Sequence, residues 1–328
     1  MSEPMALDNG GAEAIKGFNF QKANLILLAI NNYLKSNFKI YIEAEDGIVV
    51  TFDGYKAYIQ VKKQVHSISS LLQKGKKHTI ENEDGTKKTI NKPSILEKNL
   101  SSGHDDDTFK IFVKNIKPQD IKNKFNIQKP GQICNILHKP TDEAKSIILS
   151  KLSDDYKDKL NNLYIHESPL SEEYNDSIKY LIGCLNDIEV SVDNKQGRAI
   201  IAELTLTIDE KANQKIEEIS QKELKYMDTN YFSNLFITCK VLNKFNDILN
   251  SLSYNSIKKS RIGKERIKID LTKTILKDEI KENILQIVNL EDLSDKEIID
   301  TVVTNFNSRD EENTLIAIAI ECICEIGE

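Results

Sequence analysis

Residues 39–62 read KIYIEAEDGIVVTFDGYKAYIQVK, and this stretch decides the fold. Apolar and polar residues alternate near both ends of the stretch and a β-branched run fills its middle, a pattern that is typical of strands. Asp53-Gly54 is a strong turn signal between the second and third of these segments. We therefore predict a helix followed by a three-stranded antiparallel meander, with the helix at 12–37 and the strands at 39–44, 47–52 and 57–62.

The turn between the last two predicted strands brings Asp46 close to Lys62. A two-residue loop places Asp46 opposite Val61, and a four-residue loop places it opposite Lys63. Directly opposed residues lie ~5 Å apart and diagonal ones ~7–8 Å apart, so either register suffices. Gln60 and Lys62 are two positions apart and project from the same face of the strand. The three polar side chains therefore converge at one end of the meander.

Such a cluster suits metal-dependent hydrolysis of a phosphodiester. The Asp46 carboxylate can hold Mg²⁺ or Mn²⁺, which prefer oxygen ligands, and the Gln60 amide oxygen and the Val61 backbone carbonyl can complete the shell. The Lys62 ammonium can stabilise the negative charge that develops during cleavage. The alternative is an ordinary hairpin with a turn aspartate and a solvated lysine, because this motif is short and chemically common.

The order of these motifs resembles the PD-(D/E)XK, or restriction-endonuclease-like, superfamily. More narrowly, the sequence over roughly residues 10–165 is similar to the double-stranded DNA endonuclease domain of bacterial antiphage effectors, known from CBASS effectors and from the nuclease subunit of Lamassu systems. The segments that carry this resemblance are Gly17-Phe18-Asn19-Phe20-Gln21, Glu43 to Asp46, and Ile59-Gln60-Val61-Lys62.

The resemblance implies a role for each matching position. Asp46 corresponds to the metal-binding acid, and Gln60 stands where many relatives have glutamate. Lys62 corresponds to the motif lysine, and Gln21 to the polar residue that the first helix often contributes.

One position departs from the pattern. Many relatives have a second acid directly after the aspartate, where this sequence has Gly47. The metal shell can therefore draw on Glu43 or on Glu45, and the sequence leaves this choice open.

A basic block lies inside an acidic protein. The formal net charge is −6, yet the span from Gly54 to Pro130 carries sixteen lysines against eight acidic residues. Such a block is the charge pattern expected of a phosphate-binding surface. We predict that this surface binds DNA through Lys63, Lys74, Lys76 and Lys77; the alternative is a solvated loop. Residues 73–108 are polar and predict a mobile basic insertion with a short apolar stretch at Ile95-Leu96, followed by a strand at 108–113.

The rest of the chain is mostly helical in pattern. Helical spacing of apolar residues predicts helices at 142–163, 174–186, 209–226, 231–252, 270–288, 294–306 and 310–326, with a strand at 200–208 left open. Pro169 and the two residues after it mark a plausible boundary. The predicted fold is therefore an α/β nuclease domain at 1–168, with a restriction-endonuclease-like mixed sheet and flanking helices, and a mainly helical interaction or regulatory domain at 169–328.

Composition excludes several other classes. Of 328 residues only 13 are glycine and 6 are proline, too few for the frequent turns of a β-sandwich. No apolar run reaches the ~18 residues of a membrane span, and residues 1–11 lack the apolar segment of a signal peptide, so we expect a cytoplasmic protein. The five cysteines do not suggest a disulfide framework, and Cys322 and Cys324 are expected to be small apolar residues of a terminal helix. Walker A and G-x-S-x-G motifs are absent.

The function predicted from these observations is that of a metal-dependent double-stranded DNA endonuclease in an antiphage defence complex. The resemblance to Lamassu nucleases implies an SMC-like ATPase and an accessory subunit as partners that hold the nuclease inactive, and homo-oligomers on activation. The alternatives are a nuclease effector of another system such as CBASS, or a non-catalytic nucleic-acid-binding or scaffold subunit.

Overall fold

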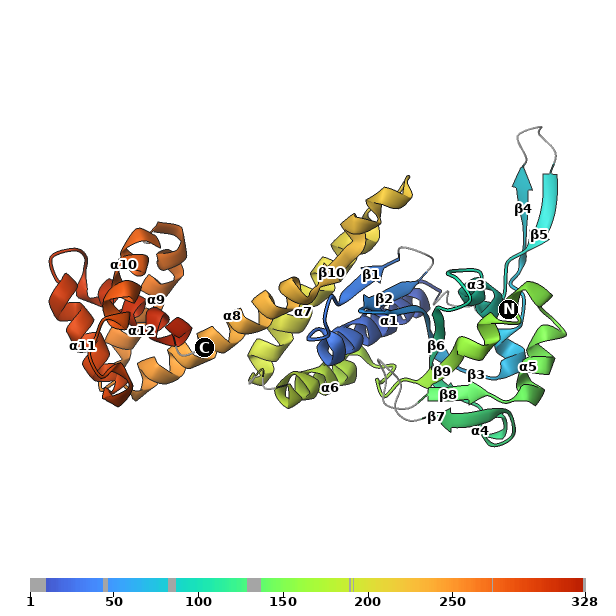
Figure 1. The fold of residues 1–328 in the computed structure, drawn as a ribbon, viewed down its shortest axis with the longest axis horizontal. Helices are drawn as coiled ribbons and strands as arrows, with labels where there is room; N and C mark the ends of the chain where they lie inside the picture. Colours follow the sequence, from blue (N-terminus) through green and yellow to red (C-terminus); the bar gives the residue numbers. More distant parts are fainter. Residues whose placement is uncertain are drawn as a thin grey trace, which may run out of the picture. The chain divides into compact units, whose positions relative to one another are not determined.

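The computed structural model describes residues 10–43, 47–81, 87–128, 137–188, 190, 192–272 and 274–326. Its contacts group the chain into two compact units, Met1–Asn234 and Leu235–Glu328, which are described separately below. The first unit contains a mixed sheet with flanking helices, and the second is helical (Figure 1). This confirms the predicted α/β architecture followed by a helical region.

The main sheet has eight strands in the order β10-β1-β2-β3-β6-β9-β8-β7. The pairs β3–β6 and β6–β9 are parallel, and the other pairs are antiparallel. Its strands are β1 (Lys39–Ile42), β2 (Ile48–Phe52), β3 (Tyr55–His66), β6 (Thr108–Ile116), β7 (Phe125–Gln128), β8 (Leu137–Pro140), β9 (Leu163–Glu167) and β10 (Tyr226–Asp228).

The meander β1–β2–β3 has the register of the two-residue loop. Phe52 pairs with Tyr55, and Ile48 pairs with Ile59. Gly54 takes a φ of 66° in the turn, a left-handed conformation that glycine adopts without steric cost. β3 is longer than predicted and continues past an irregularity in its pairing with β6, between Lys62 and Val65.

The first helix, α1 (Gly10–Asn32), packs against β3 and against two later helices, α6 (Tyr174–Asp187) and α7 (Asn194–Asn213). Its C-terminal half is buried almost throughout, from Phe20 to Ile30. A helix that is apolar on all sides is expected in the centre of a domain. Helix α1 therefore links the sheet to α6 and α7.

The basic insertion after β3 contains regular structure. It forms α2 (Ile68–Leu71), a separate hairpin of β4 (Lys77–Glu81) and β5 (Lys87–Asn91), and α3 (Ile95–Leu100). The hairpin projects away from the main sheet (Figure 1). A capping box formed by Ser94 and Glu97 begins α3, so the short apolar stretch at Ile95-Leu96 is a helix that packs on β3 and β6.

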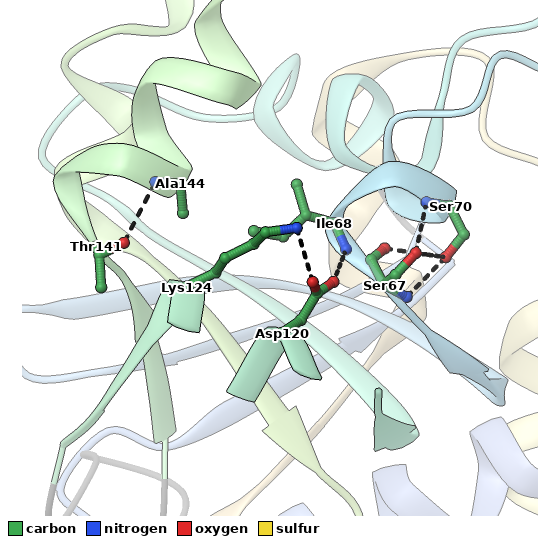
Figure 2. Close-up of polar contacts among 7 residues, drawn as sticks. All are labelled: Ser67, Ile68, Ser70, Asp120, Lys124, Thr141 and Ala144. Atoms are coloured by element: carbon green, nitrogen blue, oxygen red, sulfur yellow. Dashed lines mark hydrogen bonds and ion pairs between the residues drawn. The ribbon is translucent and has the colours of Figure 1, made fainter. Parts of the chain in front are cut away.

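A buried carboxylate fixes the chain just after β3. Asp120, on α4 (Pro118–Lys124), accepts a hydrogen bond from the backbone N–H of Ile68 at 2.8 Å and pairs with Lys124 at 2.8 Å (Figure 2). Ser67 and Ser70 complete a capping box at the same helix start. Because the first N–H groups of a helix have no partner within it, these contacts satisfy them and set the direction of α2.

Residues 142–163 do not form one long helix, and this prediction is wrong. Helix α5 (Asp142–Leu149), begun by the Thr141 side chain that accepts from Ala144 N (Figure 2), is followed by two 3₁₀ helices, η1 (Asp154–Tyr156) and η2 (Lys159–Asn162). The hydroxyl of Ser150 bonds to the carbonyl of Ile147, and that of Ser153 caps η1, so hydroxyl groups compete with the helical backbone here.

Residues 200–208 are helical, which resolves the alternative that the sequence left open. They lie inside α7, whose start is set by a capping box between Asp193 and Gln196. The single helix predicted at 209–226 is wrong. α7 ends at Asn213, and the chain then forms a separate 3₁₀ helix, η3 (Ile219–Lys225).

The contacts of residues 174–234 are with the sheet and with α1. β10 pairs with β1, with Tyr41 opposite Tyr226, and α6 and α7 pack on α1. The chain therefore divides into its compact units between Asn234 and Leu235. The predicted domains 1–168 and 169–328 remain a prediction.

The second unit packs its helices around α12 (Glu312–Ile326). The others are the C-terminal part of α8 (Thr229–Ser251), α9 (Ser256–Thr272), α10 (Thr274–Leu285) and α11 (Asp295–Phe306), with a short η4 (Leu290–Asp292). Every side chain of α12 from Thr314 to Cys322 is buried. Burial raises the pKa of Cys322 to about 12 and that of Cys324 to about 11, so both thiols behave as small apolar groups. Among the helices of the described residues, none has the combined length and hydrophobicity that a membrane-spanning segment requires.

Candidate functional site

The described residues of the predicted metal site lie next to the two ends of the loop between β1 and β2 and on β3. Glu43 directly follows β1, and Gln60 and Lys62 lie on β3, whose pairing with β2 begins at Ile48. Asp46 and Glu45 lie outside the described residues, so their predicted roles stay predictions. The remaining site is built from the two ends of this loop and from the middle of β3.

Gln60 packs against Gly47, the last residue of the loop. A Cβ atom on Gly47 would lie 2.9 Å from Gln60 Nε2 and 2.7 Å from the backbone oxygen of Ile59. Gln60 itself is only 6% exposed. The amide of Gln60 is therefore held directly beside the residue that follows Asp46 in the chain, and only glycine permits this approach.

We predict that Gly47→Ala destabilises the protein by about 1–3 kcal/mol, since overpacking forces neighbouring atoms to move. The backbone oxygen of Ile59 cannot yield without disturbing the Ile48–Ile59 pair. Denaturant unfolding of the variant measures this loss.

Gly17→Ala is the matched control for this substitution. A Cβ on Gly17 meets no atom within 4 Å, and alanine is the better helix former, so this variant should gain about 0.5–1 kcal/mol. Equal stability of the two variants would contradict the close packing of Gly47 on β3.

Gln21 and Glu43 are in direct contact. The Gln21 side-chain N–H donates to a carboxylate oxygen of Glu43. Glu43 has a φ of 50°, in the left-handed region that residues other than glycine rarely adopt. The first helix and the end of β1 thus meet at a carboxylate, and of the two acids left open by the sequence only Glu43 is described.

Lys62 is half-buried in a positive environment. Burial lowers the pKa of its ammonium from the ordinary 10.5, the positive charge of Lys98 lowers it further, and the Glu43 carboxylate opposes both effects. Burial disfavours a charged group and a like charge repels it, which is why the pKa of this ammonium lies below its ordinary value. His66, which is buried on the same strand, also has a lowered pKa, because of burial and the positive charge of Lys62. Its Nδ1 lies 3.2 Å from Ser70 Oγ.

The sequence prediction did not include Lys98. This residue lies on α3, which the buried Asn99 ties to β3 by a hydrogen bond to the Tyr58 carbonyl at 3.2 Å. The Ser94-x-x-Glu97 capping box could have revealed the helix, but nothing in the local sequence places Lys98 near Lys62.

The other predicted DNA-binding lysines fall into two groups. Lys63 is ion-paired with Glu13 on α1, so its charge is already neutralised in the structure. Lys74, Lys76 and Lys77 are exposed at the base of the β4–β5 hairpin.

An open polar cleft of about 840 Å³ borders the site. Its lining includes Glu43, the loop Ser101–Gly103, Lys215 and Lys225. A ligand that enters this cleft therefore meets the Glu43 end of the cluster. Together, the Glu43 carboxylate, the Gln60 amide and two interacting ammonium groups form a candidate site for a cation and a phosphate.

Comparison with known proteins identifies the family. The chain is 32% identical over 330 residues to the Lamassu protein LmuA of a Bacillus species, an alignment that covers 98% of this chain and 99% of that protein. No protein-family model and no solved structure matches. The chain belongs to the family of this Lamassu protein and is a Lamassu-type antiphage defence protein.

Proposed function

We propose that this protein is the metal-dependent double-stranded DNA endonuclease of a Lamassu defence complex, with a site of the PD-(D/E)XK type. The observation that carries the proposal is the packing of Gln60 beside Gly47, with Lys62 two residues further along the same strand. The cluster lies in a mixed sheet with flanking helices, in a chain of the Lamassu family.

The donor atoms suit Mg²⁺ or Mn²⁺. Among the residues that the structure describes, no three His, Cys, Asp or Glu side chains gather to hold a metal. Glu43 supplies a carboxylate, Gln60 an amide oxygen and Val61 a backbone carbonyl, and Mg²⁺ needs few protein ligands because it keeps several waters. Asp46 is the remaining proposed ligand. The bound metal would activate water and offset negative charge during phosphodiester cleavage.

The protein groups have separate roles in this proposal. Lys62 stabilises the charge on the scissile phosphate, and Lys98 adds a second positive charge nearby. Gln21 orients the Glu43 carboxylate through its hydrogen bond. The proposed partners are duplex DNA, an SMC-like ATPase and an accessory subunit, with assembly of several copies on activation. Such control suits a nuclease without sequence preference, which would otherwise cleave host DNA.

A plasmid-nicking assay on the reconstituted complex tests the proposal. We expect nicking and linearisation with Mg²⁺ or Mn²⁺ and none with EDTA. Binding of plasmid without cleavage under every metal condition would instead support the non-catalytic nucleic-acid-binding role. Cleavage that survives EDTA would contradict the proposed metal site.

Salt dependence tests the lysines at the hairpin base. We predict that replacing Lys74, Lys76 and Lys77 by glutamine weakens duplex binding and flattens the plot of log K against log salt. Each phosphate contact that is lost reduces the slope by about 0.9, because fewer counterions are released on binding. Fluorescence anisotropy at several salt concentrations measures the slope.

A matched triple variant uses exposed lysines from other parts of the first unit, Lys151, Lys157 and Lys195. It removes the same charge and should leave the slope within half a unit of the parent value. An equal change in both triple variants would mean that the hairpin base makes no specific phosphate contact.

A further inference from the structure

Glu43 is held by a group that lies far away in the sequence. Its backbone carbonyl accepts a hydrogen bond from Lys225 Nζ at 3.2 Å. The same ammonium donates to the carbonyl of Ala212 at 3.3 Å. Ala212 lies in the last turn of α7, where carbonyl groups lack helical partners and favour a positive charge. One buried ammonium therefore joins the end of α7 to the end of β1.

The backbone around Lys225 fixes where this ammonium lies. Lys225 ends η3 and directly precedes β10, whose residue Tyr226 pairs with Tyr41 on β1. Glu223 adds contacts to the same strand, with Lys39 at 3.2 Å and with the Tyr41 hydroxyl at 3.3 Å. The approach of Lys225 to Glu43 is therefore set by strand pairing and does not depend on a flexible side chain alone.

The contact acts where the backbone of Glu43 is unusual. A left-handed φ of 50° persists at a residue other than glycine only when its surroundings hold it there. The Lys225 bond holds the Glu43 carbonyl, and the Gln21 bond holds its carboxylate. The direction of the Glu43 carboxylate and the position of its backbone carbonyl depend on both contacts.

We infer that Lys225 is a positioning residue that holds Glu43 in place at the end of β1 for the proposed metal-dependent cleavage. The kinetic consequence of this inference rests on the proposed function, whereas the contact between Lys225 and Glu43 does not. Lys225 borders the cleft but is only 6% exposed, and its ammonium donates to two backbone carbonyls, so we assign it a role through Glu43. The site thus needs a residue from outside the predicted nuclease domain 1–168.

Three variants of the full-length chain test the inference. Lys225→Met removes both hydrogen bonds at similar side-chain length, and Lys225→Arg retains a cationic donor. Lys211→Met is the matched control, because Lys211 also joins α7 to the η3 segment, by a bond to the Leu224 carbonyl at 3.4 Å, without contacting Glu43. Each is studied by hydrogen exchange of metal-free protein and, in the reconstituted complex, by cleavage kinetics with Mn²⁺.

We expect Lys225→Met to speed amide exchange at least tenfold in the peptide that covers residues 40–49, with little change elsewhere. We also expect its kcat to fall about tenfold with an unchanged KM for DNA. Lys225→Arg should recover most of both losses, and Lys211→Met should match the parent protein.

Exchange at residues 40–49 that is equal in Lys225→Met and Lys211→Met would overturn the inference whatever the activity. A raised KM with normal exchange would also overturn it, since Lys225 would then contact DNA. If exchange changes as expected but the parent complex never cleaves DNA, the positioning of Glu43 stands and the proposed nuclease function fails.

Discussion

Lys62→Ala should lower cleavage by the reconstituted complex about 10²–10³-fold, the usual cost of losing one group that stabilises transition-state charge. Its ammonium is half-buried next to Lys98 and Glu43, where solvent screening is weaker than at the surface. Truncation to alanine at this position leaves the apolar core of β3 intact, so the fold should persist. Initial rates of plasmid nicking, with thermal unfolding as a check on the fold, measure the effect.

Lys56→Ala provides a control on the same strand. Lys56 is the second residue of β3, and its Nζ lies over the ring of Tyr58, 4.8 Å from the ring centroid. It lacks the Glu43 and Lys98 environment, so its loss should change cleavage less than threefold. Unchanged nicking by a folded Lys62→Ala protein would remove Lys62 from the proposed mechanism.

The pH dependence of cleavage gives a second test of the same ammonium. Burial and the charge of Lys98 lower the pKa of Lys62, so its ammonium loses its positive charge at a pH below the ordinary lysine pKa of 10.5. Cleavage should therefore fall as pH rises through this lowered pKa. Lys98→Met removes the repelling charge and should move the fall to higher pH. A fall that does not move in this variant would mean that another group is titrating.

Truncation after residue 168 should abolish folding of the first unit. It removes β10 from the edge of the sheet and the helices that cover α1. Among the buried apolar side chains that it removes are eight from the helices, β10 and the start of α8, at Leu181, Leu185, Ile200, Ile201, Leu204, Ile208, Met227 and Phe232. Burial of each stabilises a fold by roughly 1.5–3 kcal/mol. A loss on this scale is large against the ~5–15 kcal/mol net stability of a typical domain.

Circular dichroism during heating measures this result against a chain that ends at Asn234. The longer chain retains all eight residues and should unfold in one cooperative transition. A cooperative transition in both chains would show that residues 169–234 are dispensable for the fold. If only the longer chain folds, binding of partner subunits by the helical region is best tested by removing residues 235–328.

Local sequence patterns were sufficient for the meander. Alternating residues at its two ends and the Asp53-Gly54 turn predicted three strands, and the structure has them in the two-residue register. The same period of two placed Gln60 and Lys62 on one face of β3. These features depend on neighbours in the chain, which is why residue spacing alone could predict them.

Helix patterns were less reliable where side chains bind the local backbone. The hydroxyls of Ser150 and Ser153 interrupt an apolar period that otherwise continues to Leu163. The predicted apolar role of Cys322 and Cys324 agrees with their burial, because a helix that is apolar on every side belongs in a core.

The sequence by itself determined the meander, the helical C-terminal region and the shared face of Gln60 and Lys62. Only the tertiary structure decided that Lys98 lies near Lys62 and that Lys225 binds the Glu43 carbonyl. The three-residue strand β10 is too short to show a period, and its pairing with β1 joins residues far apart in the chain. Such contacts form because distant segments bury apolar surface together, and that requirement leaves no spacing signal around the residues it brings into contact.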